Sequence, residues 1–183
     1  MPPMMRRLFW FLNKFFMVPI FRLGLGPWFG NPFSGYIMVL KAIGRKTGKI
    51  RFTPVNYTIY QGNVYCISAG RETSDWYRNI LASPDIEVIM PTGALYGHVS
   101  EERGQEQRVR VARQVLQNAG FAGFFEGYNP FTISDEELSR RIDDLPILRI
   151  EPKGIANGAV DPGGGAWVWA FIVTLVIVLV AVR

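Results

Sequence analysis

The segment 44–49, with the sequence GRKTGK, has the residue types of an anion site. Gly44 and Gly48 permit tight turns and close backbone approach, and the cations beside them surround amides that a turn exposes. Such a loop predicts an anion nest between two strands. It is not a Walker A loop, because its glycine spacing is one residue short and no helix is expected after Lys49. A solvated hairpin end is the alternative interpretation.

A second candidate site is the segment 75–80, with the sequence DWYRNI. On a helix, Trp76 and Asn79 are three residues apart and share a face. An indole suits stacking on a planar ring, and the Asn79 amide offers both a donor and an acceptor. The competing interpretation places Trp76 in the core and Asn79 on the polar surface.

Several other chemistries are excluded by residue type. The one cysteine, Cys66, allows neither an intramolecular disulfide nor a CxxC metal site. With His98 as the one histidine, no metal site is expected. The sequence has no Ser-His-Asp order and no paired catalytic carboxylates, and no GxGxxG turn opens a helix for a dinucleotide. Cys66 is therefore expected as a small buried residue of a strand.

In the segments that must position these residues, apolar and polar residues alternate mostly with period two, which predicts strands. Turn residues such as those at 61–63 join neighbouring strands into hairpins. Two amphipathic segments, 74–82 and 106–119, predict helices, the first beginning at an N-cap-like Ser74. Without a βαβ rhythm, this order predicts a small antiparallel barrel, a mainly β (α+β) fold with helical inserts. The predicted strands are 36–43, 51–60, 64–69, 86–90, 94–101 and 145–151.

The chain closes on an apolar run, 166–182, that has no charge, Gly or Pro. Its 17 residues span about 25 Å as a helix, and Trp167 and Trp169 stand where an aromatic belt belongs. We therefore predict a transmembrane helix at 166–183 after a flexible linker at 153–165. A buried core helix is the alternative.

The N-terminal segment 1–21 is predicted as an amphipathic helix at the membrane interface. Its polar residues Arg6, Arg7, Asn13 and Lys14 recur at a spacing of seven and form one narrow stripe. Pro19 is expected to end or kink the helix. A signal peptide is disfavoured, because Asn13 and Lys14 interrupt the apolar run and no cleavage site follows. The expected protein is single-pass, with its domain (residues 22–152) facing the cytoplasm.

The net charge of +5 does not form the continuous basic stripe that nucleic acid requires. The basic residues lie at the N-terminus and in the loop 44–51, which suits membrane lipid and a small phosphorylated ligand. Nucleic acid is not an expected partner. The oligomeric state does not follow from the sequence.

Together, these motifs resemble the deazaflavin-dependent nitroreductase family, the split β-barrel oxidoreductases that use coenzyme F420. The resemblance covers about residues 22–152 and begins at Arg22-Leu-Gly-Leu-Gly26. It rests on the order of GRKTGK, the strand with Arg51 and Pro54, the strand end at Gly70, DWYRN and LASP. Each motif is weak alone, and their order is specific.

The resemblance implies a split barrel of the FMN-binding type and an enzyme that takes a hydride from reduced coenzyme F420. An FMN-dependent reductase of the same fold and a non-catalytic, membrane-tethered cofactor or lipid binder are the alternatives. By the resemblance, the basic loop holds the phosphate and acidic tail, and the strand end approaches the ring through backbone amides. The implied cofactor-binding residues are Arg45, Lys46, Thr47, Gly48, Lys49, Arg51, Pro54, Ser68, Ala69, Gly70, Trp76 and Asn79.

The resemblance also implies a substrate pocket of Asn56, Tyr57, Phe125 and Tyr128, with Tyr128 as the candidate catalytic proton donor. Relatives that reduce quinones or nitroaromatics carry more tyrosines there, whereas the segment 124–129 has one. Membrane attachment suits a small lipophilic acceptor, such as a quinone, a nitroaromatic or an unsaturated lipid, which the N-terminal helix would guide into the cleft.

Overall fold

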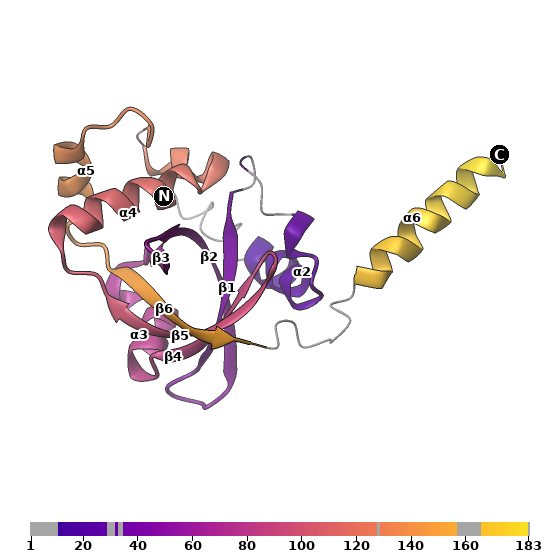
Figure 1. The fold of residues 1–183 in the computed structure, drawn as a ribbon, viewed down its shortest axis with the longest axis horizontal. Helices are drawn as coiled ribbons and strands as arrows, with labels where there is room; N and C mark the ends of the chain where they lie inside the picture. The colour runs from indigo at the N-terminus through magenta and orange to yellow at the C-terminus, as the bar shows by residue number, and fades with distance from the viewer. Residues whose placement is uncertain (1–10, 29–31, 33–34, 128, 157–165, 183) are drawn as a thin grey trace.

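The computed structural model describes residues 11–28, 32, 35–127, 129–156 and 166–182. At its centre, six strands form a closed barrel in the order β1-β2-β3-β6-β5-β4 (Figure 1). Every pairing is antiparallel, as the sequence predicts. The last strand continues past residue 152, the predicted limit of the domain. The strands are β1 (Ile37–Ile43), β2 (Ile50–Tyr60), β3 (Asn63–Ile67), β4 (Asp85–Met90), β5 (Gly93–Glu101) and β6 (Ile147–Ile155).

The long strand β2 changes its partner halfway along. Residues 50–56 pair with β1, and residues 57–60 pair with β3. Among the described strands, none pairs with the other backbone edge of residues 50–56. Since β3 pairs with β6 through Ile67, β2 and β3 separate beyond Tyr57 and Cys66. This separation leaves a free strand edge directly after the basic loop.

Apolar residues on alternate positions fill the inside of the barrel. Leu40 of β1, Val88 of β4 and Cys66 of β3 are all buried there. The helix α3 (Asp75–Ala82) adds Tyr77 to the same core. Burial raises the pKa of the Cys66 thiol to about 12, which agrees with the expected role of a small buried residue.

Two helices cover the outer face of β3 and β6, α4 (Gln105–Gln117) and α5 (Asp135–Ile142). The sequence pattern predicted α4, whereas α5 was not predicted. The missed signal is a serine cap with an acidic residue three positions later, since the Ser134 hydroxyl accepts the Glu137 N–H at 3.2 Å. The buried contact consists of Tyr65, Val111, Ala112, Leu138, Ile142 and Ile147.

The N-terminal helix packs on the outer face of β1 and β4. It comprises a π-helical stretch, η1 (Asn13–Met17), and α2 (Val18–Arg22). Met17 and Phe21 are buried against β1 and β4. Pro19 does not end the helix, as one prediction had it, because it lies in the first turn of α2, where its missing N–H costs little. Residues 1–10 of the predicted amphipathic helix lie outside the described residues.

The C-terminal helix α6 (Ala166–Ala181) stands clear of the barrel (Figure 1). It has 16 residues, and its side chains from Phe171 onward are exposed. None of the helices within the described ranges combines the length and apolar character that crossing a bilayer requires. The transmembrane helix predicted at 166–183 is therefore not supported.

The pKa of Tyr77 predicts how stability falls at high pH. Burial and a hydrogen bond to Glu101 raise this pKa from 10.0 to about 12. The protonated phenol therefore stabilises the fold fully below pH 10, and this contribution is lost as the pH rises to 12. Two pKa units correspond to about 3 kcal/mol.

Urea unfolding followed by circular dichroism at pH 8, 9.5 and 11 measures this loss. Tyr77→Phe should make the fall above pH 10 less steep, leaving the parts due to Cys66 and Tyr57. Tyr96→Phe, which alters an exposed tyrosine, should keep the full fall. Equal slopes in both variants would contradict the assignment.

Candidate functional site

The basic loop is a tight turn between β1 and β2. The Gly44 carbonyl accepts the N–H groups of Thr47, at 3.1 Å, and Gly48, at 2.8 Å. Gly48 has φ +65°, a conformation that a glycine adopts without strain. The Gly44 N–H donates to the Lys49 carbonyl at 2.8 Å, and the Lys49 N–H to the Thr47 hydroxyl at 3.4 Å. These backbone donors are used inside the loop, so the expected amide nest is wrong.

The charge of the loop is carried instead by side chains. Lys46, Lys49 and Arg51 are exposed, and none of them forms an ion pair among the described residues. The Arg51 guanidinium lies over Gly44, where a β-carbon would come within 3.4 Å of Arg51 Nε. Three exposed cations without an ion pair among the described residues therefore stand at the loop and the start of β2, an arrangement that suits an anionic ligand.

Asn79 connects this loop to α3. Its Oδ1 accepts the Arg45 backbone N–H at 3.1 Å and the Arg45 guanidinium at 3.0 Å. Arg45 also forms an ion pair with Asp75 at 2.9 Å, and this hydrogen-bonded guanidinium lowers the pKa of the Asp75 carboxyl. Arg45 and Asn79 are thus committed to each other and fix the loop against the helix. The side chain of Asn79 is buried and its carbonyl oxygen is in use, so it is a positioning residue here.

The other residues expected near the ring lie where β2 and β3 separate. Ser68 is buried, its N–H donates to the Pro146 carbonyl, and its hydroxyl donates to the Arg71 carbonyl. The Ser68 amide is therefore not available to a cofactor ring, contrary to what the resemblance implies. Ser74 does not cap α3 with its hydroxyl, which faces Ser68 at 3.5 Å. Ala69 and Gly70 are exposed at this strand end, and Trp76 packs partly on the inner core.

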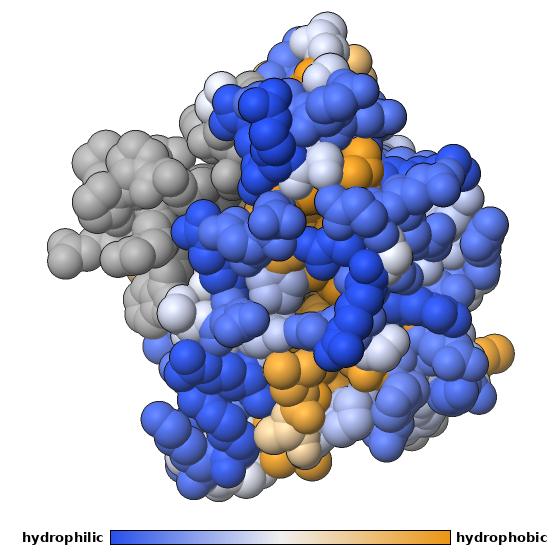
Figure 2. All heavy atoms as spheres, turned by 90° about the vertical axis from the view of Figure 1, so that its left-hand side faces the viewer, coloured by the Kyte–Doolittle hydropathy of each residue, from blue (hydrophilic) through white to orange (hydrophobic). Residues whose placement is uncertain are grey.

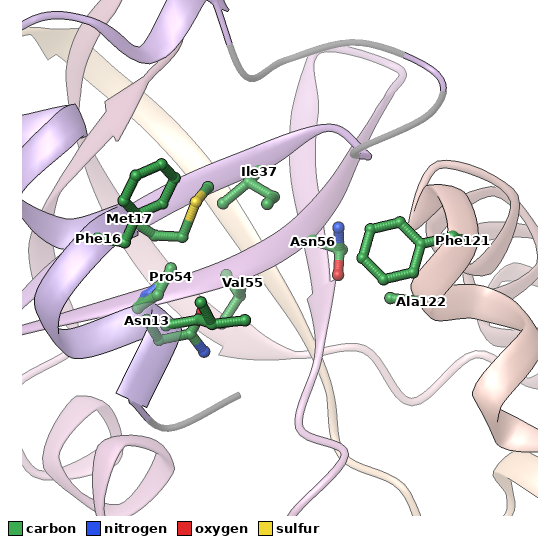
Figure 3. Close-up of a pocket in the computed structure, with 10 residues that line it drawn as sticks. Asn13, Phe16, Met17, Ile37, Pro54, Val55, Asn56, Phe121 and Ala122 are labelled. Carbon is green, nitrogen blue, oxygen red and sulfur yellow. The ribbon is translucent and has the colours of Figure 1, made fainter. Parts of the chain in front are cut away.

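An apolar cavity of about 240 Å³ lies on the outer side of β1 and β2. Figure 3 shows Phe16 and Met17 of the N-terminal helix on one side and Phe121 of η4 (Gly120–Glu126) on the other, with Asn56 between them. Asn13 and Asn56 are the polar members of the lining. The ten lining residues are Leu12, Asn13, Phe16, Met17, Ile37, Pro54, Val55, Asn56, Phe121 and Ala122.

Asn56 is held in place at this cavity. Its Nδ2 donates to the Tyr36 carbonyl at 3.3 Å, and a β-carbon on Gly35, which has φ +91°, would come within 3.0 Å of the same nitrogen. Tyr57 points to the opposite side of β2, onto the inner core, where burial and then Tyr36 raise its phenol pKa.

Of the two predicted pocket residues whose side chains the structure describes, Asn56 lines the cavity and Tyr57 does not. Tyr128 lies outside the described residues, and the Phe125 side chain is likewise not described. The N-terminal helix was expected beside the cleft, but the residues that it contributes to the lining were not predicted. Asn13 interrupts an aromatic segment with a polar side chain, and this could have indicated its place in the cavity lining.

The family model for F420H(2)-dependent quinone reductase matches residues 21–127, more than half of the chain. The chain belongs to this family. It is therefore an oxidoreductase, and coenzyme F420, not FMN, is its cofactor. A search among curated proteins gives no match.

Three solved structures illustrate the range of structural similarity. An F420-H2 dependent reductase is 22% identical, with a TM-score of 0.41, over 63% of this chain and 93% of that one. The heme storage protein HutZ from Vibrio cholerae is 14% identical, with a TM-score of 0.47, over 79% and 95%. A protein from Bacteroides thetaiotaomicron named for 5-nitroimidazole antibiotic resistance is 9% identical, with a TM-score of 0.49, over 65% and 74%. The family assignment rests on the family model and not on these structures.

The residues of this F420-dependent reductase fit its cofactor. When bound in its reduced form, coenzyme F420 supplies a hydride. Lys46, Lys49 and Arg51 would hold its anionic tail, and Pro54 lies further along the free edge of β2, beside the cavity. At about 3.3 Å per residue, Arg51 and Asn56 are roughly 17 Å apart along the strand. This separation suits an elongated cofactor with charge at one end and a ring at the other.

The exposed lysines of the loop, Lys46 and Lys49, are expected to contribute much of the affinity for F420. Lys46→Ala and Lys49→Ala should each raise the dissociation constant of F420 about tenfold or more, because each removes a charge-assisted contact of about 1.5–3 kcal/mol. Fluorescence titration at low and high salt measures the effect, and added salt should weaken binding in the unsubstituted protein. Lys153→Ala is the control, since Lys153 pairs with Glu151 on β6. Unchanged binding in both loop variants would make the loop an ordinary hairpin end.

Substitution of Asn79 is expected to lower both the stability of the fold and the affinity for F420. Asn79→Ala leaves two Arg45 donors without their acceptor, which should lower the free energy of unfolding by about 1–3 kcal/mol and weaken F420 binding. Asn79→Asp keeps an acceptor and should retain most of both. Urea unfolding and the same titration measure the two effects. Weaker binding of F420 at unchanged stability would instead indicate direct contact between Asn79 and the cofactor.

Proposed function

We propose that this protein is a membrane-associated reductase that transfers a hydride from reduced F420 to a lipid-soluble acceptor of the quinone class. The observation that carries the proposal is the apolar cavity between the N-terminal helix and β2. Its position beside Pro54 and Asn56 brings an acceptor close to the strand along which the cofactor is expected to lie. Nitroaromatics and unsaturated lipids remain further candidate acceptors.

The lining of the cavity favours a flat, apolar acceptor with a few polar atoms. Eight of its ten residues are apolar, and the two others, Asn13 and Asn56, carry neutral amides. An amide N–H can donate to a carbonyl oxygen without the desolvation cost of a buried charge. Asn13 would then orient a quinone carbonyl, while Asn56 is held by Tyr36.

The reaction requires one hydride and one proton for each quinone reduced to a hydroquinone. The hydride comes from the reduced cofactor. Tyr128, the predicted proton donor, stays a prediction, and water entering along the cavity can take the same role. The residues of the chain thus bind, orient and exclude bulk water, which is what hydride transfer needs from a protein.

Membrane association is supported by apolar surface at both ends of the chain. The exposed side chains of α6 from Phe171 onward are apolar apart from Thr174. The N-terminal helix exposes Phe11, Phe15 and Phe16 while it buries Met17 and Phe21. A helix of this kind suits the interfacial layer of a bilayer. The cytoplasmic orientation of the barrel stays a prediction.

The proposal predicts a preference among acceptors. Reduced F420 should be oxidised fastest by quinones that partition into lipid vesicles, and NADPH should not replace it, because no dinucleotide-binding turn is present in the sequence. Recovery of the oxidised F420 absorbance, with and without enzyme, measures turnover. Phe16→Ser should reduce kcat/KM about tenfold, because it places a polar group in the apolar lining. Phe171→Ser is the matched control, since it makes the same change on α6.

Two outcomes would overturn this proposal. Tight binding of F420 without turnover over a panel of quinones, nitroaromatics and enones would favour a binding role. Equal turnover of hydrophilic and lipophilic quinones in the presence of vesicles would remove the reason for a membrane-resident acceptor.

A further inference from the structure

Exposed phenylalanines stand on both walls of the cavity. On the N-terminal helix, Phe15 and Phe16 are 56% and 48% exposed. On the opposite wall, Phe121 and Phe124 of η4 are 46% and 52% exposed, and Phe131 just after η4 is 60% exposed. The two walls are about a hundred residues apart in sequence. We name Phe11, Phe15, Phe16, Phe121, Phe124 and Phe131 the phenylalanine rim.

The geometry makes the rim continuous with the cavity. Phe16 and Phe121 line it, one from each wall. Side chains three residues apart in a 3₁₀-helix eclipse one another, so Phe124 follows Phe121 on the same face of η4. Phe124 in turn stacks with Phe131, their ring centroids 6.3 Å apart. On the helix, the rings of Phe11 and Phe15 are 4.9 Å apart. Each wall thus ends in a pair of exposed aromatic rings.

We infer that the phenylalanine rim docks on a lipid bilayer, with the η4 wall as a second contact independent of the N-terminal helix. The inference rests on the proposed function, because a cavity that takes its acceptor from lipid must open toward lipid. A protein partner or a second copy seated on the rim would close the cavity that it surrounds. Phenylalanines on the apolar face of an interfacial helix insert at the boundary between headgroups and acyl chains.

The charges around the rim fit an anionic bilayer. Lys14 lies on the N-terminal helix, with its Nζ 5.2 Å from the centre of the Phe15 ring. Beyond the other wall, the Asp135 carboxylate is paired with Arg113 at 2.5 Å, which reduces its repulsion from lipid headgroups. The face on the side of α4 and α5 is mostly hydrophilic by contrast (Figure 2).

The test uses the full chain and exploits its one cysteine. Because Cys66 is buried and its pKa is raised, an environment-sensitive thiol dye should label an introduced cysteine selectively in the native protein. Dye is attached to Phe124→Cys, to Phe131→Cys and to the control Arg140→Cys, which carries the label on the exposed surface of α5. Each is titrated with vesicles of phosphatidylcholine and phosphatidylglycerol, with and without brominated acyl chains.

The expected result is a blue shift and brominated-lipid quenching for labels at 124 and 131, and neither change for the label at 140. Labels at 124 and 131 that stay in water while the protein sediments with vesicles would overturn the docking surface, as would failure to sediment. A blue shift that grows with protein concentration without vesicles would assign the rim to a second copy instead.

A kinetic comparison separates this inference from the proposed function. The double variant Phe124→Ser/Phe131→Ser should lower kcat/KM about tenfold for a quinone embedded in vesicles. For a water-soluble quinone without vesicles, it should stay within about twofold, because neither residue lines the cavity. Equal losses on both quinones would overturn the docking role. No turnover of either quinone by the unsubstituted protein would overturn the proposed function, while the dye measurement would still decide the rim.

Discussion

The change of partner along β2 is the constraint on which the rest of this structure depends. Residues 50–56 of β2 pair with β1, whereas its pairing with β3 ends at Tyr57 and Cys66, although β3 continues along β6 to Ile67. The first half of β2 therefore keeps a free backbone edge inside an otherwise closed barrel. An unpaired edge in a sheet is a binding surface by default. Here it begins at the basic loop and runs toward the cavity beside Asn56.

At the basic end of this edge, one set of residues holds the loop in place and another set supplies its exposed positive charge. Arg45, Asp75 and Asn79 bind one another and fix the loop on α3. Lys46 and Lys49 are then presented on a turn whose backbone donors are already used. The four cations of the loop therefore have two different roles, and not every one of them needs to contact the ligand. The positioning cation is partly buried and paired, and the others are exposed.

The apolar end of the edge is completed by parts of the chain that are distant in sequence. The N-terminal helix packs on β1 and β4 through Met17 and Phe21, while η4 follows α4 on the other side of β2. The space between them is the cavity, so one helix serves both as a wall of the site and as apolar surface for a membrane. Family membership gives the cofactor and the reaction class. The acceptor depends on these two walls.

The barrel, its six strands and the cofactor class could be predicted from the sequence, because period-two alternation and the order of the motifs are local properties of the chain. The sequence did not reveal α5, an eight-residue helix with two apolar side chains, Leu138 and Ile142, or the continuation of the helix through Pro19. The hydrogen bond between Asn79 and Arg45, and the cavity that Asn13 and Phe121 share, arise from the folded arrangement of the chain. Those contacts join residues 34 or more positions apart, and their geometry follows from strand pairing and helix packing, which no local pattern encodes.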